Sequence, residues 1–381
     1  MLKEFLDNKP LFYDEIDYLR MPKIYEKIKD KIILPRIVHI IGTNGKGTTG
    51  RFLATALYNL GFKTGHYTSP HILEFNERIW LNGKNVDNKR LNCAHAELQK
   101  ILTIEDSKAL SYFEYTTLLA MFIYQECDFV ILEAGLGGEY DATAVFKKKL
   151  TLVTPIDIDH EAFLGDSVKE IAFTKLNAIQ KDAIVATQKY QIVQEVAKEI
   201  ALKKDAKIYR VDDFLDKQDR DKIIQISKNL SLVDYLVENL SLSISALNFL
   251  NIEYQVDSFK NARLFGRLSA VGKNVLVDVG HNPLAATSIV NALDGEKYIL
   301  IYNSYRDKNY KKILKILKPI IKRVEIIEVN DKRIEVTQQL QSVLTELRIE
   351  YNSFKKINLK DKYLVFGSFS VVEAFLKGIS R

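Results

Sequence analysis

The sequence has few cysteines and no long apolar run. Among its 381 residues only Cys93 and Cys127 are cysteines, with no CxxC pair, which is typical of a reducing cytosol. The start of the chain, Met1–Asp7, is charged and has no apolar segment of the kind found in secretory signals. No stretch approaches the ~18 apolar residues that a membrane span needs. We therefore expect a cytoplasmic protein that does not enter a membrane.

A strong charge of either sign is also missing. Lys and Arg together number 55 and Asp and Glu 49, so the net charge is +6. Basic residues alternate with acidic ones, as in the segment Glu26–Lys31, and runs such as Lys147–Lys149 are short. Because nucleic-acid binding usually needs clustered basic residues, we expect no nucleic-acid partner. The 47% of hydrophobic residues is typical of a globular chain and excludes a disordered one.

Length and residue pattern predict two α/β domains. Short β-branched runs alternate with amphipathic stretches, which is typical of βαβ units and a mainly parallel sheet. The expected strands are 36–41, 129–133, 151–156, 183–187, 274–278, 298–302, 324–329 and 363–366, and the expected helices are 51–60, 167–180 and 283–293. The alternation restarts after 264–272, so we place a large domain at 1–262 and a smaller Rossmann-like domain at 263–381.

A glycine-rich turn follows the first expected strand and opens the first expected helix. It reads Gly42-Thr43-Asn44-Gly45-Lys46-Gly47-Thr48-Thr49. This layout is that of a phosphate cradle, because glycines let backbone N–H groups approach phosphate oxygens. We expect Lys46 to pair with β- and γ-phosphate oxygens, and Thr48 or Thr49 to reach Mg²⁺. Gly47 separates Lys46 from Thr48, unlike the usual G-x-x-x-x-G-K-[ST], so a glycine turn with a solvent-facing lysine is the alternative.

Further short motifs follow in order along the chain. The blocks are Gly42–Thr48, Tyr67–His71 with Phe75–Ile79, Leu132–Gly138 with Asp141–Thr143, Asp159–Gly165 with Lys175, Phe265–Arg267, and Asp278–Pro283. Together they resemble the dihydrofolate synthase/folylpolyglutamate synthase family of the Mur ligase superfamily. The resemblance implies a phosphate-loop ATP-binding domain of the Mur ligase central type, followed by a C-terminal glutamate ligase domain. It also implies an ATP-dependent ligase that adds L-glutamate to dihydropteroate and to (tetrahydro)folate through an acyl phosphate.

The resemblance also implies roles for individual residues. The implied ATP-binding residues are Thr43, Asn44, Gly45, Lys46, Gly47, Thr48, Asn239, Arg267 and Asp278. The implied ligands of one or two Mg²⁺ ions are Thr48, Ser69, Glu133 and His160, whose oxygens, apart from the histidine, suit a hard cation. The implied catalytic residues are Lys46, Lys175 and His281, with Lys175 as the possible carrier of a CO₂-derived carbamate. Structural alternatives remain open, such as a strand-end cap for Asp278 and a helix cap for His281.

The choice of substrate depends on the segment Ser111–Tyr115. It resembles the segment of bifunctional enzymes that accept dihydropteroate, which implies that Phe113, Glu114 and Tyr115 contact this substrate. An aromatic helix start packed in the core is the alternative. Only 41 residues precede Gly42, too few for the uridine-nucleotide domain of a cell-wall ligase. A polyglutamylation-only enzyme, or a phosphate-loop kinase or NTPase whose second domain binds a partner, are the other candidates.

The sequence departs from the family pattern at three places. Glu139 stands where the family has Arg, Ala144 where it has Asn, and Asp307-Lys308-Asn309 where many relatives have Asp-Lys-Asp. The contacts of those side chains must be made differently here. We expect a monomer whose partners are the small molecules ATP, L-glutamate and dihydropteroate or folate, and whose site, divided between the domains, closes on substrate.

Overall fold

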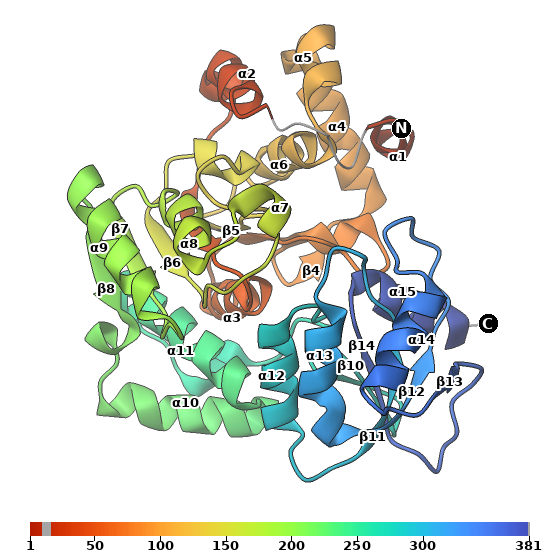
Figure 1. Ribbon diagram of the computed structural model, residues 1–381. Coiled ribbons are helices and arrows are strands. Elements are labelled where there is room, and N and C mark those ends of the chain that lie inside the picture. The colour runs from red at the N-terminus through yellow and green to blue at the C-terminus, as the bar shows by residue number, and fades with distance from the viewer. Residues whose placement is uncertain (10–16, 380–381) are drawn as a thin grey trace. The chain divides into compact units, whose positions relative to one another are not determined.

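The chain folds as two compact units. The computed structural model describes residues 1–9 and 17–379, and its units are Met1–Arg263 and Leu264–Arg381, here called unit 1 and unit 2 (Figure 1). The predicted domain boundary was placed after residue 262. In the described parts of the chain, every helix is too short or too polar to cross a lipid bilayer.

Unit 1 contains an eight-stranded sheet with the strand order β4-β3-β2-β5-β1-β6-β7-β8 in the described residues. The pairs from β2 to β8 are parallel, and β3 and β4 pair antiparallel at one edge. The bounds are β1 (Arg36–Ile41), β2 (Thr64–Tyr67), β3 (Ile79–Leu81), β4 (Lys84–Asn85), β5 (Phe129–Glu133), β6 (Leu150–Val153), β7 (Asp182–Val185) and β8 (Lys207–Arg210). The predicted α/β fold with a mainly parallel sheet is confirmed.

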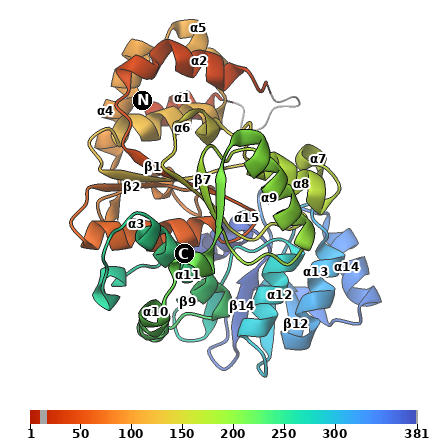
Figure 2. The same ribbon diagram turned by 90° about the vertical axis from the view of Figure 1, so that its left-hand side faces the viewer.

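Helices cover both faces of this sheet (Figures 1 and 2). Since successive side chains of a strand alternate, Val38 and Ile40 pack on one face and Ile37 and Ile41 on the other. The first face is covered by α3 (Lys46–Asn59), α10 (Lys217–Leu230) and α11 (Asp234–Phe249). The second is covered by α1 (Leu2–Asp7), α2 (Arg20–Ile28), α4 (Asn88–Ile101), α6 (Tyr112–Ile123), α8 (Val168–Leu176) and α9 (Gln191–Lys204). The shorter helices are α5 (Ile104–Ala109) and α7 (Glu161–Leu164).

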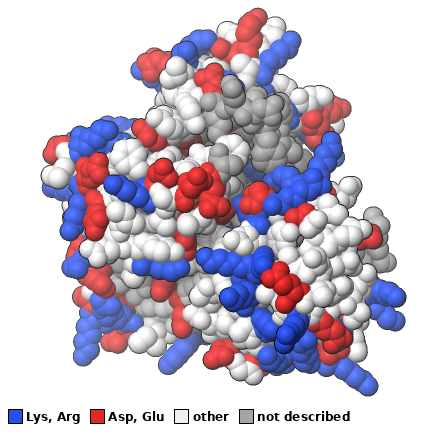
Figure 3. Space-filling model, viewed as in Figure 1, with Lys and Arg blue, Asp and Glu red and all other residues white. Residues whose placement is uncertain are grey.

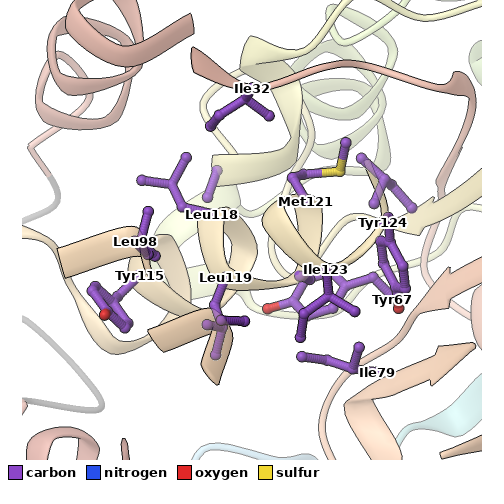
Figure 4. Packing of buried hydrophobic residues seen from close by; sticks show 14 of the residues in the cluster. Ile32, Tyr67, Ile79, Leu98, Tyr115, Leu118, Leu119, Met121, Ile123 and Tyr124 are labelled. Carbon is purple, nitrogen blue, oxygen red and sulfur yellow. The ribbon is translucent and has the colours of Figure 1, made fainter. Parts of the chain in front are cut away.

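The start of α6 is fixed by its own sequence. Ser111 Oγ accepts from the Glu114 backbone N–H at 3.1 Å, and the Glu114 carboxylate accepts from the Ser111 N–H at 2.7 Å. This reciprocal pair is a capping box, which stabilises a helix start. The helix then packs in the apolar core on the second face of the sheet, where Leu118 and Leu119 are fully buried (Figure 4).

Unit 2 has a six-stranded sheet with the order β13-β12-β11-β14-β10-β9 in the described residues, and β9 is antiparallel to its neighbour. The strands are β9 (Ser269–Val271), β10 (Val275–Val277), β11 (Tyr298–Tyr302), β12 (Ile321–Ile326), β13 (Tyr351–Ser353) and β14 (Tyr363–Phe366). The helices are α12 (Pro283–Ala292), α13 (Tyr310–Leu317), α14 (Thr337–Glu346) and α15 (Phe369–Ile379). This smaller α/β unit confirms the second part of the predicted fold class.

Charges of both signs are mixed over the face of the molecule drawn in Figure 3. Lys and Arg side chains alternate there with Asp and Glu, as the sequence pattern predicts. Many of them form exposed pairs, such as Lys311 with Glu346 at 2.6 Å. Exposed pairs of this kind contribute little to stability, so the fold depends on its apolar cores.

Candidate active site at the phosphate loop

The phosphate loop, Gly42–Thr49, lies between β1 and α3 and is anchored to the segment that follows β6. Gly42 has φ +138°, and a Cβ there would lie 2.0 Å from Thr154 Oγ1, so the position requires glycine. The Thr43 N–H donates to the Pro155 carbonyl at 2.9 Å. Thr43 Oγ1 donates to the Asp157 carbonyl at 3.0 Å and accepts from the Asp157 N–H at 3.1 Å. No local sequence pattern marks these anchors, because they depend on the pairing of β1 with β6.

The start of α3 is packed against α11. Gly45 has φ +89°, and a Cβ there would lie 2.5 Å from Asn239 Oδ1. Asn239 is buried on α11, and one turn later Ser243 Oγ donates to the Thr49 carbonyl at 2.9 Å. The structure therefore places Asn239, a predicted ATP-binding residue far along the chain, against the phosphate loop.

Lys46 and Glu133 meet at the carboxyl edge of the sheet, since β1 pairs with β5. Lys46 Nζ donates to the carbonyls of Gly42 at 3.1 Å and Thr43 at 3.3 Å, and lies 4.0 Å from Glu133 Oε1. Glu133 is buried and accepts hydrogen bonds from Thr68 Oγ1 and from the Ser69 N–H, the latter at 3.3 Å. Its position is therefore not that of a solvent-facing strand end.

Oxygen donors for a hard cation lie beside this pair. Thr48 Oγ1 is buried and has no hydrogen-bond partner among the described residues. Buried hydroxyl groups normally have a hydrogen-bond partner, so a buried hydroxyl without one, in the first turn of α3, fits the expected Mg²⁺. Within 1–9 and 17–379, no three His, Cys, Asp or Glu side chains are grouped to hold a metal.

The predicted ligand His160 lies at the start of α7. It has φ +56°, and its Nε2 lies 4.0 Å from Asp159 Oδ2. The side chain is 40% exposed, whereas Asp159 is buried. A metal-binding role for His160 stays a prediction.

Lys175 is a buried lysine on α8, not an exposed helix residue. Its Nζ donates to the Gly42 carbonyl at 3.1 Å, the same oxygen that accepts from Lys46. Burial, together with a smaller effect of the positive charge of Lys46, lowers the pKa of Lys175 to about 7, while Asp159 and Asp141 oppose the shift. Gly138 approaches this residue closely, since a Cβ there would lie 2.4 Å from the Lys175 carbonyl oxygen.

The three predicted substrate residues at the start of α6 have different surroundings. Phe113 is half-buried, and its ring would lie 2.6 Å from a Cβ at Gly135. Glu114 is held by the capping box and by Arg20 Nε at 2.8 Å. Tyr115 is fully buried, and its hydroxyl hydrogen-bonds with His95 Nδ1 at 2.6 Å. Glu114 and Tyr115 therefore have structural partners, and Phe113 is the member of the three that borders the glycine loop.

In unit 2, Arg267, Asp278 and His281 lie at the turns beside β10. Both carboxylate oxygens of Asp278 accept backbone N–H groups, from Leu268 at 2.9 Å and from Gly280 at 2.8 Å. The Arg267 guanidinium lies 5.4 Å from the centre of the Phe369 ring. The cap of α12 is Asn282, whose Oδ1 accepts from Ala285, and this role had been the structural alternative for His281.

Two of the departures from the family pattern, Glu139 and Ala144, form hydrogen bonds through their backbone, and Asn309 forms one through its side chain. The Glu139 N–H donates to the Thr174 carbonyl at 3.0 Å, and the Ala144 carbonyl accepts from Lys148 Nζ at 2.9 Å. Asn309 caps α13 by accepting from the Lys312 N–H at 3.1 Å. These interactions do not need the side chains at 139 and 144 that the family usually has.

A phosphate loop whose lysine faces a strand-end glutamate, at the carboxyl edge of a parallel sheet, defines a phosphate-loop nucleotide enzyme. Dihydrofolate synthase/folylpolyglutamate synthase of Buchnera aphidicola subsp. Schizaphis graminum is 30% identical over 368 residues, covering 88% of this chain and 86% of that protein. No family model matches the sequence. The chain belongs to the dihydrofolate synthase/folylpolyglutamate synthase family, as its motifs predict.

Solved structures agree with this assignment. The crystal structure of Helicobacter pylori folylpolyglutamate synthetase has 39% sequence identity and a TM-score of 0.80, covering 100% of this chain and 98% of that one. The bifunctional folylpolyglutamate synthase/dihydrofolate synthase from Yersinia pestis, complexed with AMPPNP and a Mn ion, has a TM-score of 0.84 at 23% identity. It covers 100% of this chain and 97% of that one, and it shares the fold. The predicted class of ATP-dependent ligase is confirmed.

Proposed function

We propose that this chain joins L-glutamate to dihydropteroate and to (tetrahydro)folate in reactions that consume ATP. The observation that carries the proposal is the convergence of Lys46, Glu133 and Lys175 on the phosphate loop, in a chain of this family. ATP and a divalent cation are its cofactors, in keeping with the AMPPNP and Mn ion of the Yersinia pestis relative. A monomer in the cytoplasm remains part of this proposal.

The chemistry follows from the charges at the loop. A substrate carboxylate oxygen attacks the γ-phosphorus of ATP, the bond to the β-phosphate oxygen breaks, and an acyl phosphate and ADP form. The amine of L-glutamate then attacks the acyl carbon, phosphate leaves with the bonding electrons, and the nitrogen loses a proton to give an amide. Lys46 neutralises charge that builds on the transferring phosphoryl group, and the backbone N–H groups of the loop orient it.

The residues that would hold Mg²⁺ are Thr48, Ser69 and Glu133, with His160 as the further predicted ligand. The orphaned hydroxyl of Thr48 and the carboxylate of Glu133 support this assignment. When bound, the cation supplies further neutralisation of phosphate charge. Asn239, which lies against Gly45, supports a role of α11 in holding the nucleotide.

Three further roles belong to the proposal. Phe113 contacts the aromatic part of dihydropteroate, supported by its half-exposed ring beside Gly135. Arg267 and Asp278 contact ATP, and His281 assists the reaction from its turn in unit 2. Lys175 carries a carbamate, supported by a pKa of about 7, at which about half of its amine is uncharged in neutral solution.

A polyglutamylation-only enzyme is the second candidate, because the Helicobacter pylori relative is named as a folylpolyglutamate synthetase alone. Phosphate release from ATP should be measured with dihydropteroate or tetrahydrofolate, each with and without L-glutamate. Release that needs dihydropteroate and glutamate together supports the bifunctional enzyme. Glutamate-dependent release with tetrahydrofolate but not with dihydropteroate supports the second candidate. Release that is indifferent to glutamate would support a kinase or NTPase and overturn both.

A further inference from the structure

Four buried polar side chains meet beneath the glycine loop, defined here as Gly135–Glu139. They are His39 on β1, Asp141, Thr143 and Lys148, each less than 9% exposed. None of them has a role in the chemistry proposed above. Burying polar groups in this way costs free energy of folding unless the groups are hydrogen-bonded.

Asp141 joins the glycine loop to the segment that follows it. One carboxylate oxygen accepts from the Gly135 and Leu136 N–H groups, both at 2.9 Å. The other accepts from the Thr143 N–H at 2.9 Å and from Thr143 Oγ1 at 2.5 Å. Burial raises the pKa of Asp141, and these four hydrogen bonds oppose that shift because they favour the charged form. The carboxylate therefore fixes the loop start to η3 (Ala142–Val145).

His39 completes the arrangement from the neighbouring strand. Its Nε2 lies 2.7 Å from Thr143 Oγ1. Since the Thr143 hydroxyl proton is donated to Asp141, the hydroxyl oxygen must accept, and His39 Nε2 must carry the proton. His39 Nδ1 has no partner among the described residues, and burial lowers the pKa of the ring well below its ordinary value. A neutral imidazole protonated at Nε2 satisfies all of these observations.

Lys148 holds the other end of the same segment. Its Nζ donates to the Ala144 carbonyl at 2.9 Å and to the Ala178 carbonyl, beyond the end of α8, at 3.3 Å. Segment 141–148 is thus tied to β1 at one end and to the α8 region at the other. The glycine loop has little freedom to move while these contacts persist.

The glycine loop packs closely against two residues of the proposed reaction. Gly135 lies against the Phe113 ring, and Gly138 lies against the main chain of Lys175. We propose that His39 and Thr143 are positioning residues, which act through Asp141 to hold the glycine loop where Phe113 is correctly placed for the pterin substrate. The expected effect on KM for dihydropteroate rests on the proposed function, whereas the expected effect on the mobility of the glycine loop does not.

The first test replaces the hydroxyl of Thr143. We expect Thr143→Val to raise KM for dihydropteroate about tenfold, the loss expected for one hydrogen bond to a charged group. The affinity for ADP should change less than about twofold, because the phosphate loop has separate anchors at Pro155 and Asp157. Thr143→Ser should restore the native KM. Thr64→Val is the matched control, since Thr64 is equally buried and its hydroxyl donates to the Phe62 carbonyl.

The second test measures the loop without any substrate. Amide hydrogen exchange at Gly135 and Leu136 should accelerate about tenfold in Thr143→Val and remain native in Thr143→Ser and Thr64→Val. Unchanged exchange, or a lower melting temperature with an unchanged KM, would overturn the inference. If the wild type fails to use dihydropteroate, the proposed function fails, while the exchange rates still decide whether the network holds the loop.

The third test concerns His39. The amide nitrogen of His39→Gln can occupy the place of Nε2 and should keep KM near the native value, whereas His39→Leu should match Thr143→Val. Nitrogen NMR of the native protein should find the His39 proton on Nε2. A proton on Nδ1, or equal KM values for the Gln and Leu variants, would contradict the proposed direction of the hydrogen bonds. These measurements remain decisive if Thr143→Val does not fold.

Discussion

Both sheets carry an acidic residue at the carboxyl end of a strand, and the two carboxylates are used in opposite ways. Glu133 ends β5 in unit 1, where it accepts from Thr68 and Ser69 and lies 4.0 Å from the Lys46 ammonium. Asp278 follows β10 in unit 2, where each of its oxygens accepts a backbone N–H of an adjacent turn. Glu133 is thus placed for charge chemistry, whereas the hydrogen bonds of Asp278 hold a turn, in addition to the contact with ATP proposed above.

The loops beside the two acids explain the difference. In unit 1 the turn after β1 leads to Lys46, the first residue of α3, and the hydroxyls of Thr48 and Thr49 in the first turn of that helix have no hydrogen-bond partner among the described residues. In unit 2 the turn after β10 is closed by Asp278 itself and by Asn282, which caps α12. An acidic strand end therefore becomes a catalytic candidate when a cation and unsatisfied donors surround it. The acid alone does not distinguish the two cases.

The largest effect is expected for Lys46→Ala. Removing the cation beside Glu133 should lower glutamate-dependent phosphate release about a thousandfold, since electrostatic stabilisation of the phosphoryl group is lost. The melting temperature should stay near the native one, because Lys46 donates only to two loop carbonyls. Lys63→Ala, at an exposed position, is the control. Near-normal ATP cleavage in Lys46→Ala would contradict the assignment of charge chemistry to the Glu133 site of unit 1.

Glu133→Gln keeps the shape of the side chain and removes its charge. We expect turnover to fall about a hundredfold and the Mg²⁺ concentration needed for half-maximal rate to rise, because a carboxylate binds this ion better than an amide. The hydrogen bonds from Thr68 and Ser69 can persist to the amide oxygen, so stability should change little. A Mg²⁺ dependence equal to that of the wild type would contradict a metal-binding role.

Asp278→Asn tests the other half of the comparison. An amide offers one acceptor oxygen where Asp278 uses two, so one of the N–H groups of Leu268 and Gly280 loses its partner. We expect the free energy of unfolding to fall by about 1–3 kcal/mol, measured by denaturant titration. Unchanged stability combined with a loss of ATP affinity would instead make Asp278 a nucleotide ligand first, and the contrast with Glu133 would disappear.

The sequence predicts those parts of the fold and of the site that depend on residues within one short segment. The strands 36–41, 129–133, 298–302 and 363–366 are found at their expected bounds, since large apolar or β-branched residues form most of each segment. Short or half-exposed strands such as β3 and β8 have no such run and were not predicted. The predicted helix 167–180 ends at Leu176 in the structure, and the predicted helix 51–60 begins earlier, at Lys46.

The site shows the same division between local and tertiary information. Lys46 and Glu133 could be proposed because glycines and strand ends mark them in the sequence. The anchors Thr154 and Asp157, and the full burial of Tyr115, depend on which strands and helices become neighbours. No spacing rule within one segment encodes such contacts, so pattern reasoning could not find them.

The smallest and most specific effect is expected for Lys175, as a dependence on pH. Its pKa is lowered from 10.5 to about 7, so the folded chain holds a neutral amine above pH 7 and an ammonium below it. Folding therefore releases a proton from this group between about pH 7 and 10.5, and its contribution to stability rises with pH across that window and is lost as pH falls through 7.

Only the neutral amine reacts with CO₂, and the resulting carbamate would carry a negative charge that is attracted to Lys46, which donates to the same Gly42 carbonyl. With isotopically labelled bicarbonate we expect a carbamate NMR signal at about pH 8 that disappears toward pH 6, with a severalfold fall in turnover. Lys175→Met should abolish the signal. Lys9→Met should retain it, because Lys9 is also buried, with a pKa of about 8, but donates to the Ser107 and Leu110 carbonyls, away from the phosphate loop. Loss of the signal in Lys9→Met instead of in Lys175→Met would show that burial alone, without the second cation at Gly42, selects the lysine that is modified.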